Sequence, residues 1–408
     1  MAVVTLLTLR LTVDNRPVIG WWGGVSLAAV LFTGLSVLMR LPRHRAWAVS
    51  IWTSVVFIAA IGVIWAATLT ARTENALVGT PVASDAQVNR YLGDSLPPGR
   101  ETIRVPTGVY IESIKFIDAN DAEVSGYVWQ RYARSVPGEI KRGVVLVEAG
   151  DSYDEKEVYR YRHGDDEVIG WYFNTTFRQK FDYGKYPLDR QNVWLRMWHP
   201  EMNRSVVLTP DMASYPPWKQ KALYGIDPGF VPGSWTLRRT AFSYSMLPDR
   251  TSFGIGRYTH RTPVPELYFN VTMSREFISP LMGRLIPFAF MATLAFAALF
   301  IITRRVDRYP LTGFDSLALI GFAASILLVL AVDHTSVRQE TGSHGVSYIE
   351  CFYASMYVVI TLLVVNSVLL TKTDRIGVLD WRDNLLPKIL YWPVITFLVF
   401  CVTAGTFV

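Results

Sequence analysis

The stretch from Leu267 to Thr303 constrains the fold of this chain more than any other. Its first part, residues 267–277, alternates apolar and polar side chains, which is typical of a half-buried β-strand. The apolar run 278–303 that follows is long enough to cross a lipid bilayer as one helix. A strand that leads straight into a membrane helix predicts a folded β-domain outside the membrane, joined rigidly to a helical bundle.

Hydrophobic residues make up 50% of the 408-residue chain and are concentrated in blocks, which indicates a membrane protein with one soluble domain. The uncharged blocks Val18–Met39 and Ala46–Thr70 predict an N-terminal transmembrane hairpin. A bundle of four spans is predicted further along the chain, at 278–303, 314–332, 346–371 and 389–408.

Basic residues sit mainly beside these apolar blocks. They gather in the links 40–45, 304–308 and 372–388, which the positive-inside rule places in the cytoplasm. The β-domain is then extracellular or periplasmic, and the chain is a multi-pass protein of the inner or plasma membrane. Because the membrane topology accounts for the formal charge of +6, we expect the lipid bilayer as a partner and no nucleic acid.

The region before the joint has the pattern of a β-sandwich. About eight or nine short alternating segments, separated by Gly, Pro and Asp turns, predict an immunoglobulin-like fold. The predicted order is a tail and transmembrane hairpin at 1–72, a linker at 73–100, a β-sandwich at 101–276 and a four-helix membrane domain at 277–408.

A loop with an unusual tip separates two of the predicted strands. It runs from Tyr186 through Pro187 to Asp189, and Pro187 cannot donate a ladder hydrogen bond. The loop resembles the signature loop of the pentameric ligand-gated ion channels, the Cys-loop receptor superfamily. Animal members close this loop with a disulfide, whereas this chain has Gln179 and Val193 at the matching positions, as is usual for prokaryotic relatives.

Two further features resemble the same family. Arg275 ends the last predicted strand, and Pro287 follows twelve residues later inside the first helix. The predicted sandwich also precedes four spans, with a short outer loop between the second and the third. The resemblance covers residues 101–408, and the N-terminal hairpin lies outside the family pattern.

The resemblance implies a homopentamer with a pore lined by the second span and an agonist site between neighbouring sandwiches. It also implies that the signature loop presses on the loop between spans two and three. The gating residues would then be Tyr186, Pro187, Asp189, Arg275 and Pro287, with Asp189 and Arg275 as an ion pair at the domain junction. We expect Asp189→Ala to leave assembly intact and to abolish ligand-dependent opening.

The second span has two candidate pore-lining registers. The favoured register turns these residues toward the axis: Asp315, Leu319, Phe322, Ile326, Val329 and Asp333. The other register consists of Ser316, Ile320, Ala323, Leu327, Leu330 and His334. Rings of aspartate would select permeant cations, and the apolar belt would close the pore by dewetting. The arginines at 304–308 favour anions instead, and a pore that does not conduct is a further alternative.

In the family the agonist sits in an aromatic box, which binds cations through the ring faces. The candidates for this small-molecule site, chosen by position, are Trp129, Trp171, Tyr172, Trp198, His199 and Tyr258. His199 departs from the aromatic residue expected after the signature loop, so the sequence leaves the agonist unidentified. Aromatic residues make up 13% of the chain, so most of them are expected in the core.

Two charged residues, Arg284 and Glu350, fall inside predicted spans, where charges are costly. Counted from the outer face, their depths differ by about 3 Å at a rise of roughly 1.5 Å per residue. We therefore expect them to pair within or between subunits, with His334 as a candidate proton-sensitive neighbour. The alternative is that each reaches the membrane interface separately.

The sequence offers little for catalysis. Acidic residues gather at 151–157 and 165–167, where solvated turns are expected more often than a divalent-ion site. The histidines lack ligand spacing, and there is no nucleophile elbow or phosphate loop. We therefore expect no enzyme activity, no metal and no cofactor. The alternatives to a channel are a non-conducting membrane receptor with the same fold and a six-span transporter.

Overall fold

The computed structural model describes residues 40–70, 77–96, 102–150, 156–201, 206–216, 223–246, 265–302, 316–342, 345–372 and 381–408. Within these ranges it contains two β-sheets and five helices that are long and apolar enough to cross a membrane. This agrees with the prediction of a multi-pass membrane protein. The first span of the predicted hairpin, Val18–Met39, lies outside the described residues.

The chain divides into two compact units. The first, which we call the helical unit, comprises Met1–Ala71, Tyr183–Leu188 and Phe277–Val408. The second, the sheet unit, comprises Arg72–Asp182 and Asp189–Glu276. The short segment Tyr183–Leu188 is therefore grouped with the helices, although it is flanked on both sides by residues of the sheet unit.

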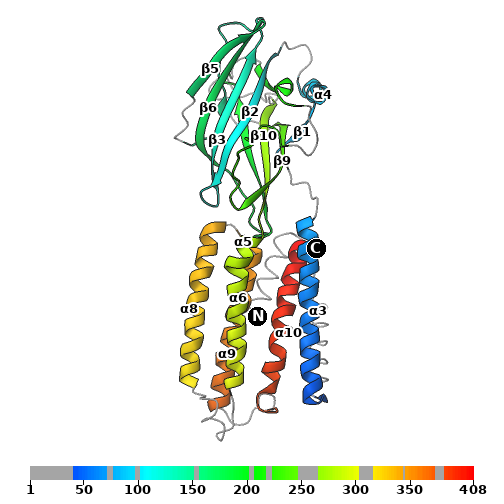
Figure 1. The fold of residues 1–408 in the computed structure, drawn as a ribbon, viewed down its shortest axis with the longest axis vertical. Coiled ribbons are helices and arrows are strands. Elements are labelled where there is room, and N and C mark those ends of the chain that lie inside the picture. The colour runs from blue at the N-terminus through cyan, green and yellow to red at the C-terminus, as the bar shows by residue number, and fades with distance from the viewer. Residues whose placement is uncertain are drawn as a thin grey trace, which may run out of the picture. The chain divides into compact units, whose positions relative to one another are not determined.

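The sheet unit contains two five-stranded sheets (Figure 1). The first sheet has the order β1 (Thr80–Val82), β9 (Trp235–Ser245), β10 (Glu266–Arg275), β7 (Arg190–Trp198), β4 (Val145–Leu146). The second has the order β5 (Lys156–His163), β6 (Asp166–Arg178), β3 (Asp121–Tyr132), β2 (Ile103–Phe116), β8 (Val206–Pro210). The pair β2–β8 is parallel, and the other named strand pairs are antiparallel.

Side chains from the two sheets pack against each other. Phe116 of β2 and Trp235 of β9 lie with ring centroids 4.6 Å apart, and the Tyr244 hydroxyl of β9 donates to the Leu208 carbonyl of β8 at 2.9 Å. Strand β7 buries every second side chain, as the period of two requires. These inward side chains of β7 are Gln191, Val193, Leu195 and Met197.

The segment predicted as a linker, 73–100, contains β1 and the helix α4 (Asp85–Ser95). Ser84 caps this helix, because its hydroxyl accepts a hydrogen bond from the Gln87 amide. Val88 and Leu92 are buried, so one face of α4 packs on the sheet unit. A short 3-10 helix, η1 (Met212–Ser214), follows β8.

Among its described residues, the helical unit has five long apolar elements. They are α3 (Arg43–Thr70), the run formed by α5 (Ile278–Pro280), η2 (Leu281–Leu285) and α6 (Ile286–Ile301), then α8 (Ser316–Thr341), α9 (Tyr348–Lys372) and α10 (Leu385–Phe407). The π-helical turn η2 lies directly before Pro287, which has no amide hydrogen to bond the carbonyl one turn earlier.

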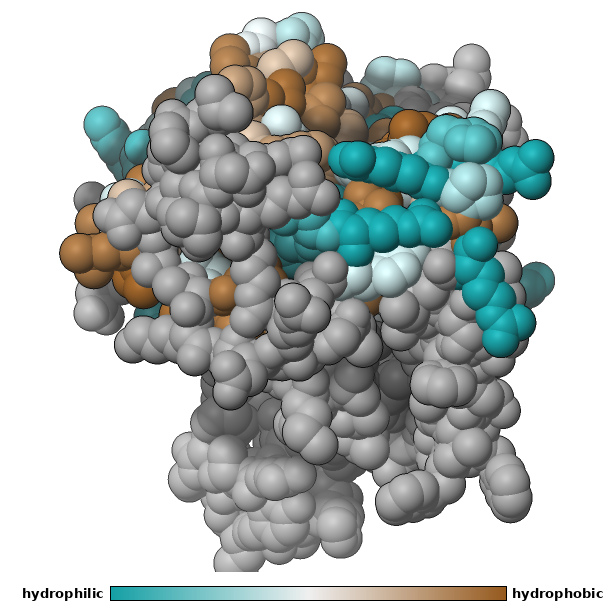
Figure 2. All heavy atoms as spheres, turned by 90° about the horizontal axis from the view of Figure 1, so that it is seen from below, coloured by the Kyte–Doolittle hydropathy of each residue, from teal (hydrophilic) through white to brown (hydrophobic). Residues whose placement is uncertain are grey.

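Helix α3 packs along α10, and α8 packs on α9 (Figure 1). Ala46 of α3 is fully buried against Leu385 and Ile389 of α10, and the Phe57 ring contacts two phenylalanine rings of α10 in tilted geometry. Arg43, at the start of α3, is exposed. Figure 2 shows hydrophilic side chains beside hydrophobic ones in the view from below.

Candidate functional site

Asp189 and Arg275 form the ion pair expected from the sequence. The Arg275 Nε donates to one carboxylate oxygen at 2.7 Å, and a terminal nitrogen donates to the other at 3.2 Å. The Asp189 side chain is 0% exposed and also accepts a hydrogen bond from Gln191 at 2.9 Å. The guanidinium lies 4.2 Å from the ring centroid of Trp235. This closed, bidentate arrangement is the strong form of an arginine–carboxylate contact.

Strand register explains why these two residues meet. Ser274 of β10 lies opposite Arg190 of β7, so the next residues outward, Arg275 and Asp189, are also neighbours. The Arg275 amide donates to the Asp189 carbonyl at 3.1 Å, which extends the ladder by one bond. The pair is therefore built by the ends of two central strands. Its role in gating stays a prediction.

The residues just before Asp189 contact helices. The Tyr186 hydroxyl donates to Glu340 near the end of α8 at 3.2 Å, and the Tyr348 amide at the start of α9 donates to the Gly184 carbonyl at 3.0 Å. Tyr186 is 3% exposed, and the peptide bond to Pro187 is cis. The segment that carries the family resemblance thus lies against the end of α8 and the start of α9.

Arg284 forms a second charged cluster, inside the helical unit. It contacts Asp333 and, at 2.6 Å, Glu340, and it donates to the Ser336 hydroxyl at 3.1 Å. The Tyr353 hydroxyl of α9 donates to the same Asp333. One arginine of the first span therefore holds three polar side chains of α8.

Arg284 and Glu350 were expected to pair within or between subunits. Within the chain they do not pair with each other. Glu350 instead contacts Arg338 at 2.6 Å and accepts hydrogen bonds from the amide and hydroxyl of Ser347 at 2.6 and 3.0 Å. The physical reason is that α8 continues to Thr341, nine residues past the predicted end of the span at 332. The added turns supply an acid for Arg284 and a base for Glu350.

Sequence reasoning therefore missed Ser336 and Glu340 as partners of Arg284. A signal was present, because Asp333, Ser336 and Glu340 are spaced i, i+3, i+7 and so share one face of an α-helix. His334 lies nearby, with its ring stacked on Tyr353 at 5.1 Å and its Nε2 at 3.5 Å from the Glu350 carboxylate.

The residues of the favoured pore register of α8 do not share one exposed face in the structure. Leu319 and Ile326 are buried against the chain's own helices, and Asp333 is held by Arg284, so these three lie against other helices of the chain. Val329 is exposed and Phe322 is half-buried, while Asp315 lies outside the described residues. In the other register, Ala323 and Leu330 are buried too.

A third face of α8 is exposed at every position. It lies opposite the buried face and consists of Leu317, Gly321, Ala324, Leu328, Ala331, Val332 and Thr335. The sequence could not distinguish these faces, because α8 has no charged side chain on any side between Leu317 and Val332. A helix without a polar side gives no amphipathic signal.

The ligand-site candidates do not gather in one place. Trp171 and His199 are buried in the sheet unit, at 6% exposure each, and Tyr258 lies outside the described residues. His199 accepts a hydrogen bond from the Glu201 amide through Nδ1, and its Nε2 has no hydrogen-bond partner within the described residues. Burial lowers the pKa of His199 to about 4.

Trp198 belongs to a charged cluster on the first sheet. Arg196 donates to both carboxylate oxygens of Glu266, at 2.7 and 2.6 Å, and its guanidinium lies 4.8 Å from the Trp198 ring centroid. Glu266 also accepts hydrogen bonds from the Trp198 ring nitrogen at 2.9 Å and from the Tyr268 hydroxyl at 3.0 Å. The ring of Trp198 is therefore already covered by a cation of the protein itself.

Trp129 and Tyr172 lie on the outer face of the second sheet. Gly108 stands opposite Trp129 on β2, and a Cβ there would come within 2.1 Å of the Trp129 ring. A Cβ at Gly170 would likewise come within 2.1 Å of the Tyr159 ring. Two glycines thus let aromatic rings lie close over the sheet. We call this surface the aromatic face; its rings are Tyr110, Tyr127, Trp129, Tyr159, Tyr161 and Tyr172, each half-buried or exposed.

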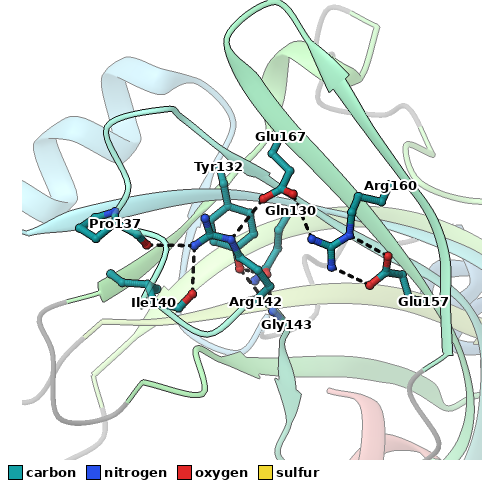
Figure 3. Close-up of polar contacts among 9 residues, drawn as sticks. All are labelled: Gln130, Tyr132, Pro137, Ile140, Arg142, Gly143, Glu157, Arg160 and Glu167. Carbon is teal, nitrogen blue, oxygen red and sulfur yellow. Dashed lines mark hydrogen bonds and ion pairs between the residues drawn. The ribbon is translucent and has the colours of Figure 1, made fainter.

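Charged side chains at one end of the second sheet bind one another (Figure 3). Arg160 donates to Glu157 at 2.8 Å and to Glu167 at 3.0 Å, and Arg142 donates to the same Glu167 at 3.4 Å. The Arg142 guanidinium lies 4.0 Å from the Tyr132 ring centroid. Two of the acidic residues considered for a divalent ion are therefore neutralised by arginine.

The described residues offer charged contacts and aromatic rings as candidate functional features. Among the described residues, no group of three His, Cys, Asp or Glu side chains could hold a metal ion. What they do contain are buried arginine–carboxylate contacts at strand and helix ends and an aromatic face. A scan against models of known protein families gives no match, and a search of curated proteins finds no significant relative.

Proposed function

We propose that this chain is the subunit of a homopentameric, ligand-gated cation channel whose β-sandwich lies outside the membrane. The observation that carries the proposal is that two parts of the signature loop contact different elements. Gly184 and Tyr186 contact the start of α9 and the end of α8, while Asp189, three residues on, holds Arg275 at the end of β10. This stretch is therefore part of both units of the chain.

The coupling step runs through Glu340. This carboxylate accepts a hydrogen bond from Tyr186 through one oxygen and an ion pair from Arg284 through the other. A shift of the loop that carries Tyr186 changes the contacts of α8 with the first span. Since Glu340 is half exposed and Asp333 offers Arg284 a second acid, two arrangements of the cluster are available. Ligand binding opens the channel by favouring one of them.

The exposed face of α8 lines the pore in this proposal. Leu317, Ala324 and Leu328 form its apolar part, which closes to ions by dewetting, and Thr335 lies nearer its outer end. The carboxylates of Glu340, five to a pentamer, favour cations at the outer mouth. This register replaces both of the registers considered from the sequence.

The ligand is an organic cation that binds the aromatic face. Trp129, Tyr159 and Tyr161 present rings that are half-buried or exposed, and such rings attract cations through their π faces. The alternative box around Trp198 is a poorer site, because Arg196 already covers that ring. Trp129→Ala is expected to weaken the response to a quaternary amine, whereas Trp198→Phe affects stability first.

The decisive experiment reconstitutes the purified protein in liposomes. Native mass measurement is expected to give five subunits, and a panel of amines is expected to start cation flux. Tyr186→Phe removes one hydroxyl and Glu340→Gln removes its partner charge. Each is expected to reduce the flux response, and the double variant to do no worse than the stronger single variant. A monomer, or additive effects of the two substitutions, would overturn the proposal.

One observation favours a second candidate, a receptor that does not conduct. The exposed face of α8 is apolar over most of its length, and a pore lined in this way can stay dry in every state. A pentamer that binds an amine and changes its protease or exchange pattern, without any ion flux, would identify this receptor.

A further inference from the structure

Helix α3 lies outside the pattern of four spans, yet it is bonded into the bundle. Pro393 interrupts α10 and cannot donate an amide hydrogen to the Ile389 carbonyl one turn earlier. The Ser50 hydroxyl of α3 donates to that carbonyl at 2.6 Å. Ser50 and Ile389 are both buried, so α3 supplies a bond that α10 lacks.

A relay of hydrogen bonds then connects α3 to the start of α9. The Trp65 ring nitrogen donates to the Tyr348 hydroxyl at 2.9 Å, and that hydroxyl lies 2.7 Å from the Thr403 hydroxyl of α10. The single hydroxyl hydrogen of Thr403 is donated to a backbone carbonyl, so Tyr348 is the donor in its bond to Thr403. Thr403 in turn donates to the Val399 carbonyl at 2.7 Å. The relay therefore has one direction, from α3 through α9 into α10.

The middle member of this relay also contacts the signature loop. Tyr348 is 1% exposed, and its backbone amide donates to the Gly184 carbonyl at 3.0 Å. Trp65 has a second contact in the same layer, an edge-on ring contact with Phe277 at 5.5 Å, two residues after Arg275. One side chain of α3 thus contacts the start of α9 and the start of the first span.

We propose that Trp65 is a positioning residue, through which α3 fixes the start of α9 and its bond to the signature loop. This inference rests on the proposed function for its meaning in gating, because α3 would then be a regulatory fifth span of each subunit. The positioning itself does not depend on ion conduction. Figure 1 shows α3 alongside α10, at the edge of the helical unit opposite α8.

The same helix contains matched controls. Trp52 of α3 is 69% exposed, so Trp52→Phe makes the same chemical change without touching the relay. Ser54 is as buried as Ser50, but its hydroxyl bonds a carbonyl of its own helix. Ser54→Ala therefore controls for Ser50→Ala.

Hydrogen exchange on the full chain in lipid nanodiscs tests the positioning. Trp65→Phe is expected to speed exchange of the Tyr348 amide about tenfold, the factor that one ordinary hydrogen bond provides. Trp52→Phe is expected to leave it unchanged. Thr403→Val breaks the far end of the relay without altering α3 and is expected to act in the same direction. Exchange at Tyr348 that is equal in wild type, Trp65→Phe and Thr403→Val would overturn the inference.

Amine-dependent flux in liposomes separates the two proposals. If wild-type protein passes no ions but Trp65→Phe still frees the Tyr348 amide, the channel proposal fails and the positioning role stands. If wild-type protein conducts, Trp65→Phe is expected to shift the half-maximal amine concentration several-fold relative to Trp52→Phe. A channel whose exchange and amine response are both insensitive to Trp65 would reduce α3 to a membrane anchor and overturn the inference.

Discussion

Two arginines of this chain, Arg275 and Arg284, meet carboxylates in opposite ways. Arg275 binds one acid, Asp189, through both oxygens, and that acid is 0% exposed. Arg284 is shared between two acids of α8, Asp333 at 23% and Glu340 at 50% exposure. A closed pair fixes a position, because breaking it leaves a buried charge. A shared arginine can exchange one acid for the other at little cost.

This difference between the closed pair and the shared arginine indicates two roles for the contacts of the signature loop. The pair of Asp189 and Arg275 ties the ends of β7 and β10 together as one piece. The cluster at Arg284 joins the first span to α8 and includes Tyr186 through Glu340. In the proposed channel the first contact transmits movement and the second responds to it.

The largest expected effect is the loss of the closed pair. Asp189→Ala leaves Arg275 buried without its acid and is expected to cost about 3–5 kcal/mol of stability in the sheet unit. Asp333→Ala is expected to cost less than half of this, because Arg284 keeps Glu340. Denaturant unfolding followed by tryptophan fluorescence measures both. Equal costs would remove the distinction between the two clusters.

His199 extends the comparison to a base that is buried without an acid bonded to it. Burial lowers its pKa from 6.5 to about 4, so folding favours the neutral ring. Its contribution to stability is complete above pH 6.5 and is lost as the pH falls toward 4. The full change is about 3 kcal/mol. His199→Gln is expected to flatten the dependence of the unfolding midpoint between these pH values, and an unchanged slope would contradict this.

A smaller effect is expected at Glu266, which accepts four hydrogen bonds. Glu266→Gln keeps the shape but loses the charge opposite Arg196, which retains Glu148 at 3.6 Å. The expected cost is about 2 kcal/mol, between the closed pair and the shared cluster. Glu148→Gln is the matched control with a smaller expected cost. A larger cost for Glu148 than for Glu266 would reverse the assignment.

The smallest expected effect on stability is that of Glu340→Gln. The side chain is half exposed, and solvent screens its ion pair, so the cost is expected to stay below about 1 kcal/mol. Its effect on amine-dependent flux is expected to be large relative to this cost. A variant that loses stability and keeps its flux would contradict the coupling role of Glu340.

Several strands were accessible from the sequence, because the period of two marks β7 and β10. The ion pair of Asp189 and Arg275 was expected from the resemblance of the loop to a channel family, and the structure contains it. The apolar blocks likewise predicted spans that the structure contains, apart from Val18–Met39, which lies outside the described residues. Local patterns suffice where one face of an element differs chemically from the other.

The sequence was insufficient where that contrast is missing. Helix α8 carries no charged side chain between Leu317 and Val332, so the sequence could not show which face packs on α9. Leu319 and Ile326, which were expected to face a pore, are buried within the chain. The end of α8 was set at the last apolar residue, and this excluded Glu340. The contacts of Trp198 depend on strand geometry, because Arg196, which covers its ring, precedes it by two residues and Glu266 comes from another strand.

The bond between Ser50 and Ile389 joins residues that are 339 positions apart. During synthesis α3 is made long before α10, so the Ser50 hydroxyl reaches the carbonyl freed by Pro393 only when α10 docks on α3. Docking of these two helices is therefore one step in the folding of the helical unit. Ser50→Ala should delay this step and leave newly made chains open to quality-control proteases for longer than Ser54→Ala does.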